Sequence, residues 1–513
     1  MTFVGARRTH DDVVAPTLDD PVAMAASAPI GGPLGRHSRG STGWWTPMRA
    51  VLAVAMITFG LGVIQKSPCV VERWADAQTP FPYSHLCYSD LGALYVNRGL
   101  AEGMAPYEPV DDLPSVKQPA TADAANDLTL EYPVGAGLWL GLAALVTHAV
   151  GESPDLSDVP HEQVGADLRV QHDTAVFWGV NAVGLFLLML GAVALLVRAQ
   201  RRRPWDAMLV AASPALALTA LINVDLLALV SLAGILWAWS TRRPSVTGVL
   251  IGLGAATKLF PVFVLGPLFV LCLRERRLPV FARTFGWAVV SWLVIDVPVY
   301  IWSPDAFSWF WTFNARRGPD FGSLWLVASN YGHTASAHTI NLVMWLLFVP
   351  VCAAVAALGL LAPRRPRLVQ LLYLVVVAFL IINKVYSPQY VLWLLPLAAL
   401  ARPRWRDMAI WQACEIFYFF AVWMHIADFF VAAGSPDWLY AVAVGVRIAG
   451  ELYVAALVVR DIWLPWHDPV RSDGLSDDPL GGILDEGIDA ERWGWTREQP
   501  DDEELAGLTP AAR

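Results

Sequence analysis

Apolar residues follow one another in long blocks along this chain, and they do not alternate with polar residues. A helix needs about 20 apolar residues, at 1.5 Å each, to cross the hydrocarbon layer of a membrane. The pattern therefore predicts membrane-spanning helices near 48–65, 174–198, 205–222, 224–241, 281–302, 338–361, 368–385, 387–401, 408–431 and 438–462. The block 246–273 is interrupted by the polar break Lys258-Leu-Phe-Pro261, so we expect two short helices that meet there. The total is then about 12 spans, and the fold class is an all-α polytopic membrane protein.

Composition agrees with this interpretation. The chain of 513 residues is 56% hydrophobic and only 16% charged, whereas soluble proteins are about 25% charged. Its net charge of −9 argues against a general nucleic-acid binder, which needs a basic surface.

Arginine clusters predict the orientation. The positive-inside rule places the clusters at 198–203, 242–243, 274–277, 364–367 and 402–406 in the cytoplasm. Alternating spans satisfy this only if 246–273 is a hairpin. We therefore expect a membrane domain over 48–463 between two disordered cytoplasmic tails, 1–47 and the acidic 464–513. The two large polar loops, 66–173 and 303–337, then lie on the outer face, as do all four lysines.

The apolar segment 133–150 does not fit as a span, because counting it as one would place the cluster at 198–203 outside. We expect a helix that lies along the outer leaflet or dips into it. The alternative is that 133–150 crosses, 246–273 forms one long span, and two arginine clusters lie outside.

The first outer loop holds the first candidate for chemistry. Asp90 stands at a predicted helix start, where Ser89 or Asp90 can act as the N-cap. Asp90 is therefore either a cap or a carboxylate available as a general base. Glu131 and Tyr132 open the segment 133–150, where they either begin the helix or line a site.

Polar residues at the turns between spans are the next candidates. Asn223 and Asp225 are common turn residues, but they lie at the same predicted face as Lys258. A lysine within an apolar segment needs an anionic partner, so Lys258 either binds a ligand or pairs with a carboxylate such as Asp225.

A third group interrupts the apolar stretch that runs up to Leu400. Lys384, Tyr386 and Gln389 surround a proline there, a pattern typical of a helix break that lines a cavity. In the second outer loop, Arg316 and Arg317 either pair with nearby aspartates or bind phosphate, and His333 is a weaker candidate.

We expect no metal and no cofactor. The sequence has no Walker loop, no Rossmann fingerprint and no Gly-x-Ser-x-Gly, and Asp76 and Asp90 do not make a convincing metal pair. Cys69 and Cys87, the two cysteines outside the spans, flank the Asp90 region and are candidates for a disulfide.

Five stretches in this order resemble glycosyltransferase family 87: CYSDLGALYVNRGLAEGMAPY, EYP, NVDLLAL, KLFPVFVLGPL and NKVYSPQYVLWLLPL. This family comprises GT-C-type membrane enzymes of actinobacteria, including mannosyltransferases that use polyprenyl-phosphate mannose. The resemblance extends over about residues 48–462 and implies the GT-C fold. The stretch 108–130 and the loop 151–173 do not obviously match.

The resemblance implies a catalytic role for Asp90, which matches the family's aspartate in the first outer loop. It would take the proton from an acceptor hydroxyl of a cell-envelope glycolipid or glycan on the outer face. The donor would be a polyprenyl-phosphate sugar, and its leaving phosphate needs cations, for which Lys258, Lys384, Arg316 and Arg317 are available. The expected activity is inverting α-mannosyl transfer, with an α-1,2 linkage.

Three alternatives remain open from the sequence. The donor sugar is mannose or, second, arabinofuranose. A lipid or glycan transporter would place polar groups near the midplane and show internal repeats, whereas here they gather at one edge. A non-catalytic assembly partner in envelope synthesis would have a degenerate site, whereas these positions are all filled.

Overall fold

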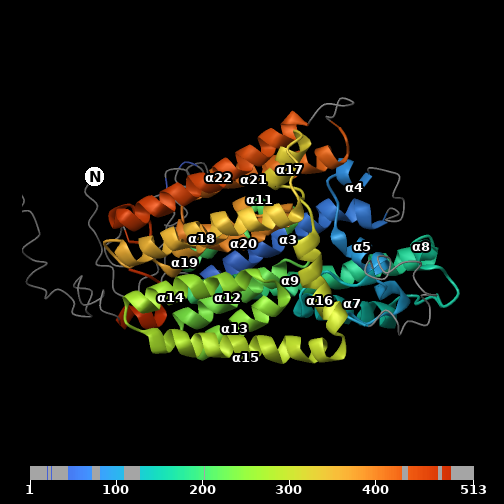
Figure 1. Cartoon of the computed structure of the whole chain (residues 1–513), viewed down its shortest axis with the longest axis horizontal. Helices are drawn as coiled ribbons and strands as arrows, with labels where there is room; N and C mark the ends of the chain where they lie inside the picture. The colour runs from blue at the N-terminus through green and yellow to red at the C-terminus, as the bar shows by residue number, and fades with distance from the viewer. Residues whose placement is uncertain are drawn as a thin grey trace, which may run out of the picture.

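The computed structural model describes residues 44–71, 81–108, 128–200, 203–429, 437–471 and 477–486, together with residues 20 and 25. Within these ranges all regular elements are helices and there is no strand. The long helices pack side by side in one elongated bundle (Figure 1). The prediction of an all-α polytopic membrane protein is confirmed, whereas the expected disorder of 1–47 falls almost entirely outside the described residues.

Twelve segments form the bundle in the part of the chain that the structure describes. Six are single helices long and apolar enough to cross a membrane: α3 (Pro47–Val71), α9 (Leu168–Ala199), α15 (Leu278–Trp302), α18 (Ala337–Leu361), α21 (Trp405–Ile426) and α22 (Trp438–Trp463). The others are shorter or broken: η5–α10–α11 (Pro204–Thr219), α12 (Leu226–Ser240), α13 (Pro244–Thr257), η6–α14 (Phe260–Arg274), α19 (Leu368–Ile382) and η7–α20 (Pro388–Ala401).

The predicted break in 246–273 is present. Helix α13 ends where Lys258, its C-cap, takes an extended conformation with φ −149° and ψ 132°. Pro261 then stands in the first turn of η6, where its missing N–H costs nothing. The chain thus reverses at Lys258, and each of the two short helices carries it along the bundle once.

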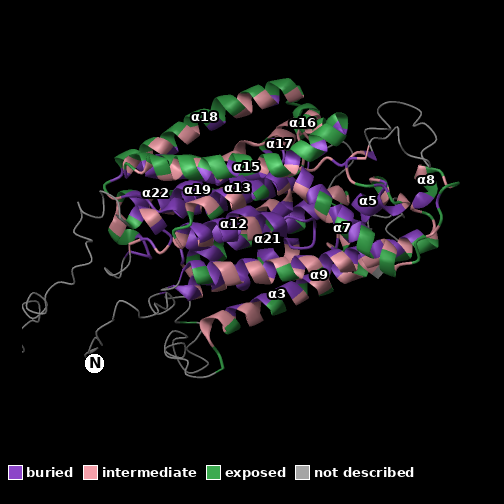
Figure 2. Ribbon diagram, turned by 90° about the horizontal axis from the view of Figure 1, so that it is seen from below, coloured by how far each residue is buried: buried purple, intermediate pink, exposed green. Residues whose placement is uncertain are grey.

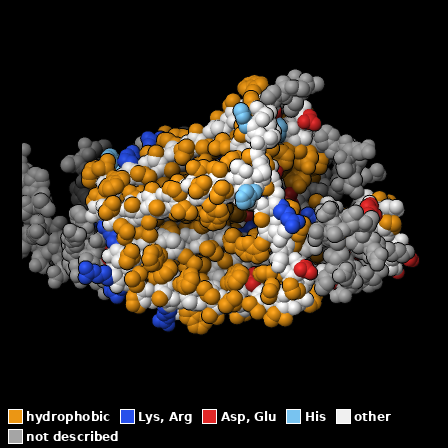
Figure 3. Space-filling model, viewed as in Figure 1, with side chains coloured by type: hydrophobic (Ala, Val, Ile, Leu, Met, Phe, Trp, Pro, Cys, Tyr) orange, Lys and Arg blue, Asp and Glu red, His pale blue; other side chains and the backbone are white. Residues whose placement is uncertain are grey.

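The two ends of the bundle differ in chemistry. One end, which we call the pocket end, gathers the turns at Asn223, Lys258 and Lys384 around one cavity. The five arginine clusters lie at the other ends of the same helices, and Lys and Arg side chains are concentrated at the left of Figure 3. We call this the arginine end. Consecutive segments therefore run in opposite directions.

Helix α7 (Val134–Val150) stays at the pocket end and does not run the length of the bundle (Figures 1 and 2). It lies beside the first half of α9, where the Trp139 indole donates to Asn181 Oδ1 at 2.9 Å. Its C-cap Gly151 lies against Asp173, near the start of α9. The position of segment 133–150 along the outer leaflet stays a prediction.

Burial divides the bundle into a core and a lipid-facing surface. Helices α12, α19 and α20 are mostly buried, whereas α15 and α18 are largely exposed (Figure 2). Helix α15 packs on α13 through Gly248 and Gly252, where an added Cβ would collide with the α15 backbone. Small residues allow this close approach between helices in a membrane.

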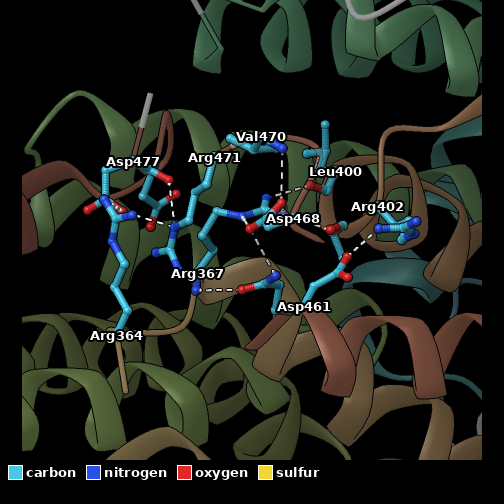
Figure 4. Close-up of polar contacts among 12 residues, drawn as sticks. Arg364, Arg367, Leu400, Arg402, Asp461, Asp468, Val470, Arg471 and Asp477 are labelled. Carbon is cyan, nitrogen blue, oxygen red and sulfur yellow. Dashed lines mark hydrogen bonds and ion pairs between the residues drawn. The ribbon is translucent and has the colours of Figure 1, made fainter. Parts of the chain in front are cut away.

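The segment after α22 differs from the prediction of a tail disordered from residue 464. Residues 464–471 and 477–486 form η8 (Pro465–His467), η9 (Gly482–Glu486) and turns that pack on the arginine end. Leu480 and Leu484 are buried there. Composition suggested disorder because the segment is acidic, but its carboxylates meet the arginine clusters (Figure 4). Residues 472–476 and 487–513 lie outside the described residues.

Asp468 is the most buried anchor of this contact. It accepts hydrogen bonds from Arg367 Nε and Nη2, both at 2.9 Å, and from Gln370 Nε2 at 3.2 Å (Figure 4). Arg367 also donates to the carbonyls of Leu400 and Ala401, so this segment ties together the ends of α19, α20 and α22.

We expect Asp468→Asn to lower the free energy of unfolding by about 3 kcal/mol, because it leaves the buried Arg367 without its countercharge. Asp485→Asn removes a more exposed partner of Arg365 and should cost less. Thermal unfolding of both variants in nanodiscs checks this. Equal midpoints for the two variants would contradict a structural role for the buried pair.

The topology gives a second prediction. Cysteines placed at Glu162 and His333 should react with an impermeant maleimide in intact cells, and cysteines at Arg198 and Arg243 should react only after permeabilisation. All four positions are exposed, so their reactivity reports the side of the membrane. Labelling at Arg198 without labelling at Glu162 in intact cells would mean that α7 crosses.

Candidate active site

A cavity of about 480 Å³ opens at the pocket end. Its walls come from the loop between α3 and α9, the turns before α12 and after α13, the helices that follow α15, and the break between α19 and α20. Five sequence positions far apart therefore meet at one place, which is large enough for a sugar and part of a lipid phosphate. Among the candidates, the residues that line it are Asp90, Glu131, Tyr132, Asn223, Lys258, Arg317, Lys384 and Gln389.

Asp90 begins helix α5 (Asp90–Asn97), but it does not cap the helix. The cap is Ser89, whose hydroxyl accepts from the Leu91 N–H at 3.5 Å. The Asp90 N–H donates to the Ile222 carbonyl at 2.7 Å, which fixes the helix start against the turn before α12. Asp90 is thus not the N-cap, and its side chain lines the pocket.

The side chains of Asn223 and Tyr88 hold the Asp90 carboxylate in place by hydrogen bonds. Asn223 Nδ2 donates to Asp90 Oδ2 at 2.7 Å and lies 2.6 Å from the Tyr132 hydroxyl. Burial raises the pKa of Asp90 above its ordinary value, and the hydrogen bonds from Tyr88 and Asn223 act against that rise. The same burial raises the pKa of Tyr88, so its phenol remains a donor.

Lys258 lines the pocket, but its positive charge is already paired with a carboxylate of the protein. Its ammonium lies 3.3 Å from Asp225 Oδ1, and the Trp393 indole donates to the same oxygen at 3.0 Å. Asp225 is fully buried behind the wall. The nitrogen also lies 5.0 Å from the centre of the Tyr132 ring, a cation–π distance. The structure thus contains the pairing with Asp225 that the sequence left open.

Lys384 lies at the opposite side of the pocket and has neutral partners. Its ammonium donates to Asn341 Oδ1 at 2.8 Å and lies 3.5 Å from the Ala315 carbonyl. No carboxylate among the described residues forms an ion pair with it. Burial lowers the pKa of Lys384, and the positive charge of Arg317 lowers it further. Lys384 and Arg317 are thus neighbouring cations, and Lys384 forms no ion pair among the described residues, so the two can bind an anion.

Arg317 itself is only partly neutralised. It forms an ion pair with Asp320, and both side chains remain accessible, at 33% and 23% exposure. Its guanidinium lies 5.5 Å from the ring of Phe313, which places it over the pocket beside Lys384. At the loop side of the pocket, Glu131 forms a two-pronged pair with Arg98, at 2.8 and 2.9 Å.

Four predicted site residues do not line the pocket: Asp225, which lies behind its wall, Arg316, His333 and Tyr386. Arg316 and His333 are exposed on the outer surface, away from its walls. Tyr386 faces the interior, where its hydroxyl hydrogen-bonds with Glu451 and its ring lies 3.4 Å from the guanidinium of Arg447. Its role is to fix the break, because Arg447 also donates to the Tyr386 carbonyl at 2.7 Å.

Cys69 and Cys87 form the expected disulfide, with their Cα atoms 5.7 Å apart. The bond joins the end of α3 to the residues just before α5. It therefore holds the start of the loop that carries Asp90 close to the bundle.

The sequence did not single out several pocket residues. Asn341 is the clearest case. It is a polar residue in the first turns of the apolar helix α18, and a polar residue within a span is a signal of function. Tyr88 stands two residues before Asp90, and the sequence showed it only as a member of the stretch that begins CYSDLGALY. Other wall residues that the prediction missed include Arg98, Phe310, Trp311 and Trp393.

A bundle of apolar helices with a polar pocket at one end is typical of a membrane enzyme that acts at the bilayer surface. The family model of glycosyltransferase family 87 matches residues 168–383, which include most of the pocket's turns. The match confirms the resemblance to this family of GT-C-type enzymes over residues 168–383, and it indicates a membrane glycosyltransferase. No curated protein matches the chain at a significant level.

Proposed function

We propose that the protein transfers a sugar from a polyprenyl phosphate to a hydroxyl of a cell-envelope glycolipid or glycan, with inversion. The observation that carries this proposal is that one pocket is lined by the carboxylate of Asp90 and by the ammonium of Lys384, which forms no ion pair among the described residues. The sugar is mannose, joined by an α-1,2 linkage, and arabinofuranose is the alternative donor sugar. The pocket faces the outside of the cell, and both termini are cytoplasmic.

The reaction needs a base at one side of the anomeric carbon and positive charge at the other. Asp90 removes the proton from the acceptor hydroxyl while that oxygen forms a bond to the anomeric carbon. The bond between this carbon and the phosphate oxygen breaks, and its electron pair leaves with the lipid phosphate. Lys384 and Arg317 stabilise the negative charge on that phosphate. Lys258 is a further candidate, although Asp225 shares its charge.

Residues of this chain supply every role in that scheme. Asn223 and Tyr88 orient the carboxylate, and the apolar wall residues Phe263 and Phe379 offer a surface for the lipid chain of the donor. The step requires no cofactor and no nucleotide site. The partners are therefore the lipid-linked donor, the acceptor and the bilayer.

The test is transfer by the purified protein in nanodiscs. Polyprenyl-phosphate mannose and polyprenyl-phosphate arabinofuranose are supplied separately, with an envelope lipid extract as acceptor, and the product is analysed by mass spectrometry and NMR. Inverted mannosyl product supports the proposal. Product from the arabinose donor alone would replace mannose by arabinofuranose. Movement of the lipid across the bilayer without transfer from either donor would overturn the proposed function.

A further inference from the structure

A second carboxyl group lies beside the main pocket without a function so far. Asp296 of α15 is buried, with 5% of its surface exposed, although it stands on one of the most lipid-exposed helices. Its Oδ2 has no hydrogen-bond partner among the described residues. A buried carboxyl oxygen without a partner is costly, so its presence points to a partner that comes from outside the protein.

Asp296 faces a small cavity of about 10 Å³, which is room for a single hydroxyl-sized group. Trp292, Phe307 and Tyr107 form its far walls. The Tyr107 hydroxyl is already engaged, because it donates to the carbonyls of Tyr132 and Pro133, at 2.9 Å each. The carboxyl oxygen is therefore the polar group still available there.

This small cavity is next to the main pocket. The two cavities share five wall residues: Tyr132, Pro133, Leu259, Phe310 and Trp311. A substrate in the main pocket is thus separated from Asp296 by the thickness of these side chains. The smaller space has room for one hydroxyl-sized group, and a substrate hydroxyl would enter it past these shared side chains.

The chemistry of the cavity selects among substrate groups. A carboxyl group repels a phosphate, and it disfavours a hydrocarbon chain because its oxygen would remain without a hydrogen bond. A sugar hydroxyl donates to the oxygen, and the apolar carbons of the ring pack on the aromatic walls. The size of the cavity, its carboxyl oxygen and its aromatic walls therefore all favour a sugar hydroxyl.

We propose that Asp296 accepts a hydrogen bond from one sugar hydroxyl of a substrate in the main pocket, and that it thereby helps to select that sugar. The proposal rests on the proposed function, since it requires a sugar in the pocket. Asp296 is a specificity residue that takes no part in bond making, and the sugar belongs either to the donor or to the acceptor.

The experiment compares Asp296→Leu with wild type in nanodiscs, with donor and acceptor titrated separately. Loss of one hydrogen bond to a charged group should raise the KM for one substrate by about 10-fold to 100-fold, with kcat little changed. The substrate whose KM rises carries the hydroxyl. Asp296→Asn keeps an acceptor oxygen and should lose less. Asp305→Asn, an exposed acid at the start of α16 (Pro304–Arg316), is the matched control and should behave as wild type.

Stability distinguishes this role from a structural one. Leu replaces an unpaired polar group by an apolar one, so the thermal midpoint should stay or rise. Substrates that each lack one hydroxyl give a second test: one of them should be poor for wild type but no poorer for Asp296→Leu. An active variant with unchanged KM for both substrates would overturn the proposal, as would a lower midpoint with normal kinetics. Absence of transfer by wild type would instead overturn the proposed function.

Discussion

Asp90→Asn should leave a folded, membrane-inserted protein whose transfer rate is lower by about 10²- to 10⁴-fold, the range for loss of a general base. The amide keeps the shape of the side chain but cannot take the acceptor proton. Because Ser89 caps α5, the substitution leaves the helix start intact. The measurement is the initial rate of transfer from polyprenyl-phosphate mannose, beside thermal unfolding of the same sample.

Asp155→Asn serves as the charge control, since that residue is exposed in the same outer loop. It should retain the wild-type rate. Transfer by Asp90→Asn within a few-fold of wild type would remove Asp90 from the catalytic role. A rate that falls only in proportion to a lost folded fraction would show a structural role instead.

The pH profile gives an independent check on the same residue. Asp90 works as a base only when ionised, and burial raises its pKa above the ordinary value. The rate should therefore fall as the pH is lowered through this raised pKa, starting at a higher pH than for an exposed aspartate with a pKa of about 3.9. Asp90→Asn should lose this acidic limb and keep the remainder of the profile.

The sequence predicted the helices well because hydrophobic blocks of membrane length depend on local composition. The break at Lys258 was also predictable, since a lysine and a proline interrupt an apolar run. The N-cap was less certain, because Ser89 and Asp90 are both good caps. Only the fold decides between them: the Ser89 hydroxyl accepts from the Leu91 N–H, and Asp90 is the first residue of the helix.

Partnerships across the bundle were harder to predict. Composition predicts disorder for an acidic tail, but Asp468 finds Arg367 about a hundred positions away and both become buried. Asn341 is likewise invisible as a partner of Lys384 until α18 and the α19–α20 break lie side by side. The sequence shows which residues carry charge, whereas the packing decides which charges are already neutralised.

That difference separates the two lysines of the pocket. Lys384→Met should raise the KM for the donor by about 10- to 150-fold, the equivalent of one charge-assisted hydrogen bond of 1.5–3 kcal/mol. Its ammonium is held by the neutral Asn341 and faces no carboxylate within the described part of the chain, so its charge is available to the lipid phosphate. The thermal midpoint should change little, because Met preserves most of the packing.

Lys258→Met should act on stability instead. It leaves Asp225, which is fully buried, with the Trp393 indole but no countercharge. Breaking a buried pair in this way costs about 3–5 kcal/mol. The double variant Lys258→Met with Asp225→Asn removes both charges, so it should recover most of the stability and isolate the contribution of Lys258 to donor binding.

Donor titrations of Lys384→Met and of the double variant, at matched folded fraction, therefore identify the lysine that holds the phosphate. We expect a raised KM for Lys384→Met and a nearly normal KM for the double variant. A folded double variant with a KM raised 10-fold would add Lys258 to the phosphate site, since its charge would then act on the donor despite Asp225. Normal donor kinetics in both variants would remove both lysines and leave Arg317 as the cation of the proposed phosphate site. In each case the decisive quantity is the positive charge that remains after pairing inside the protein, because charge already neutralised by a carboxylate stabilises an anionic leaving group less.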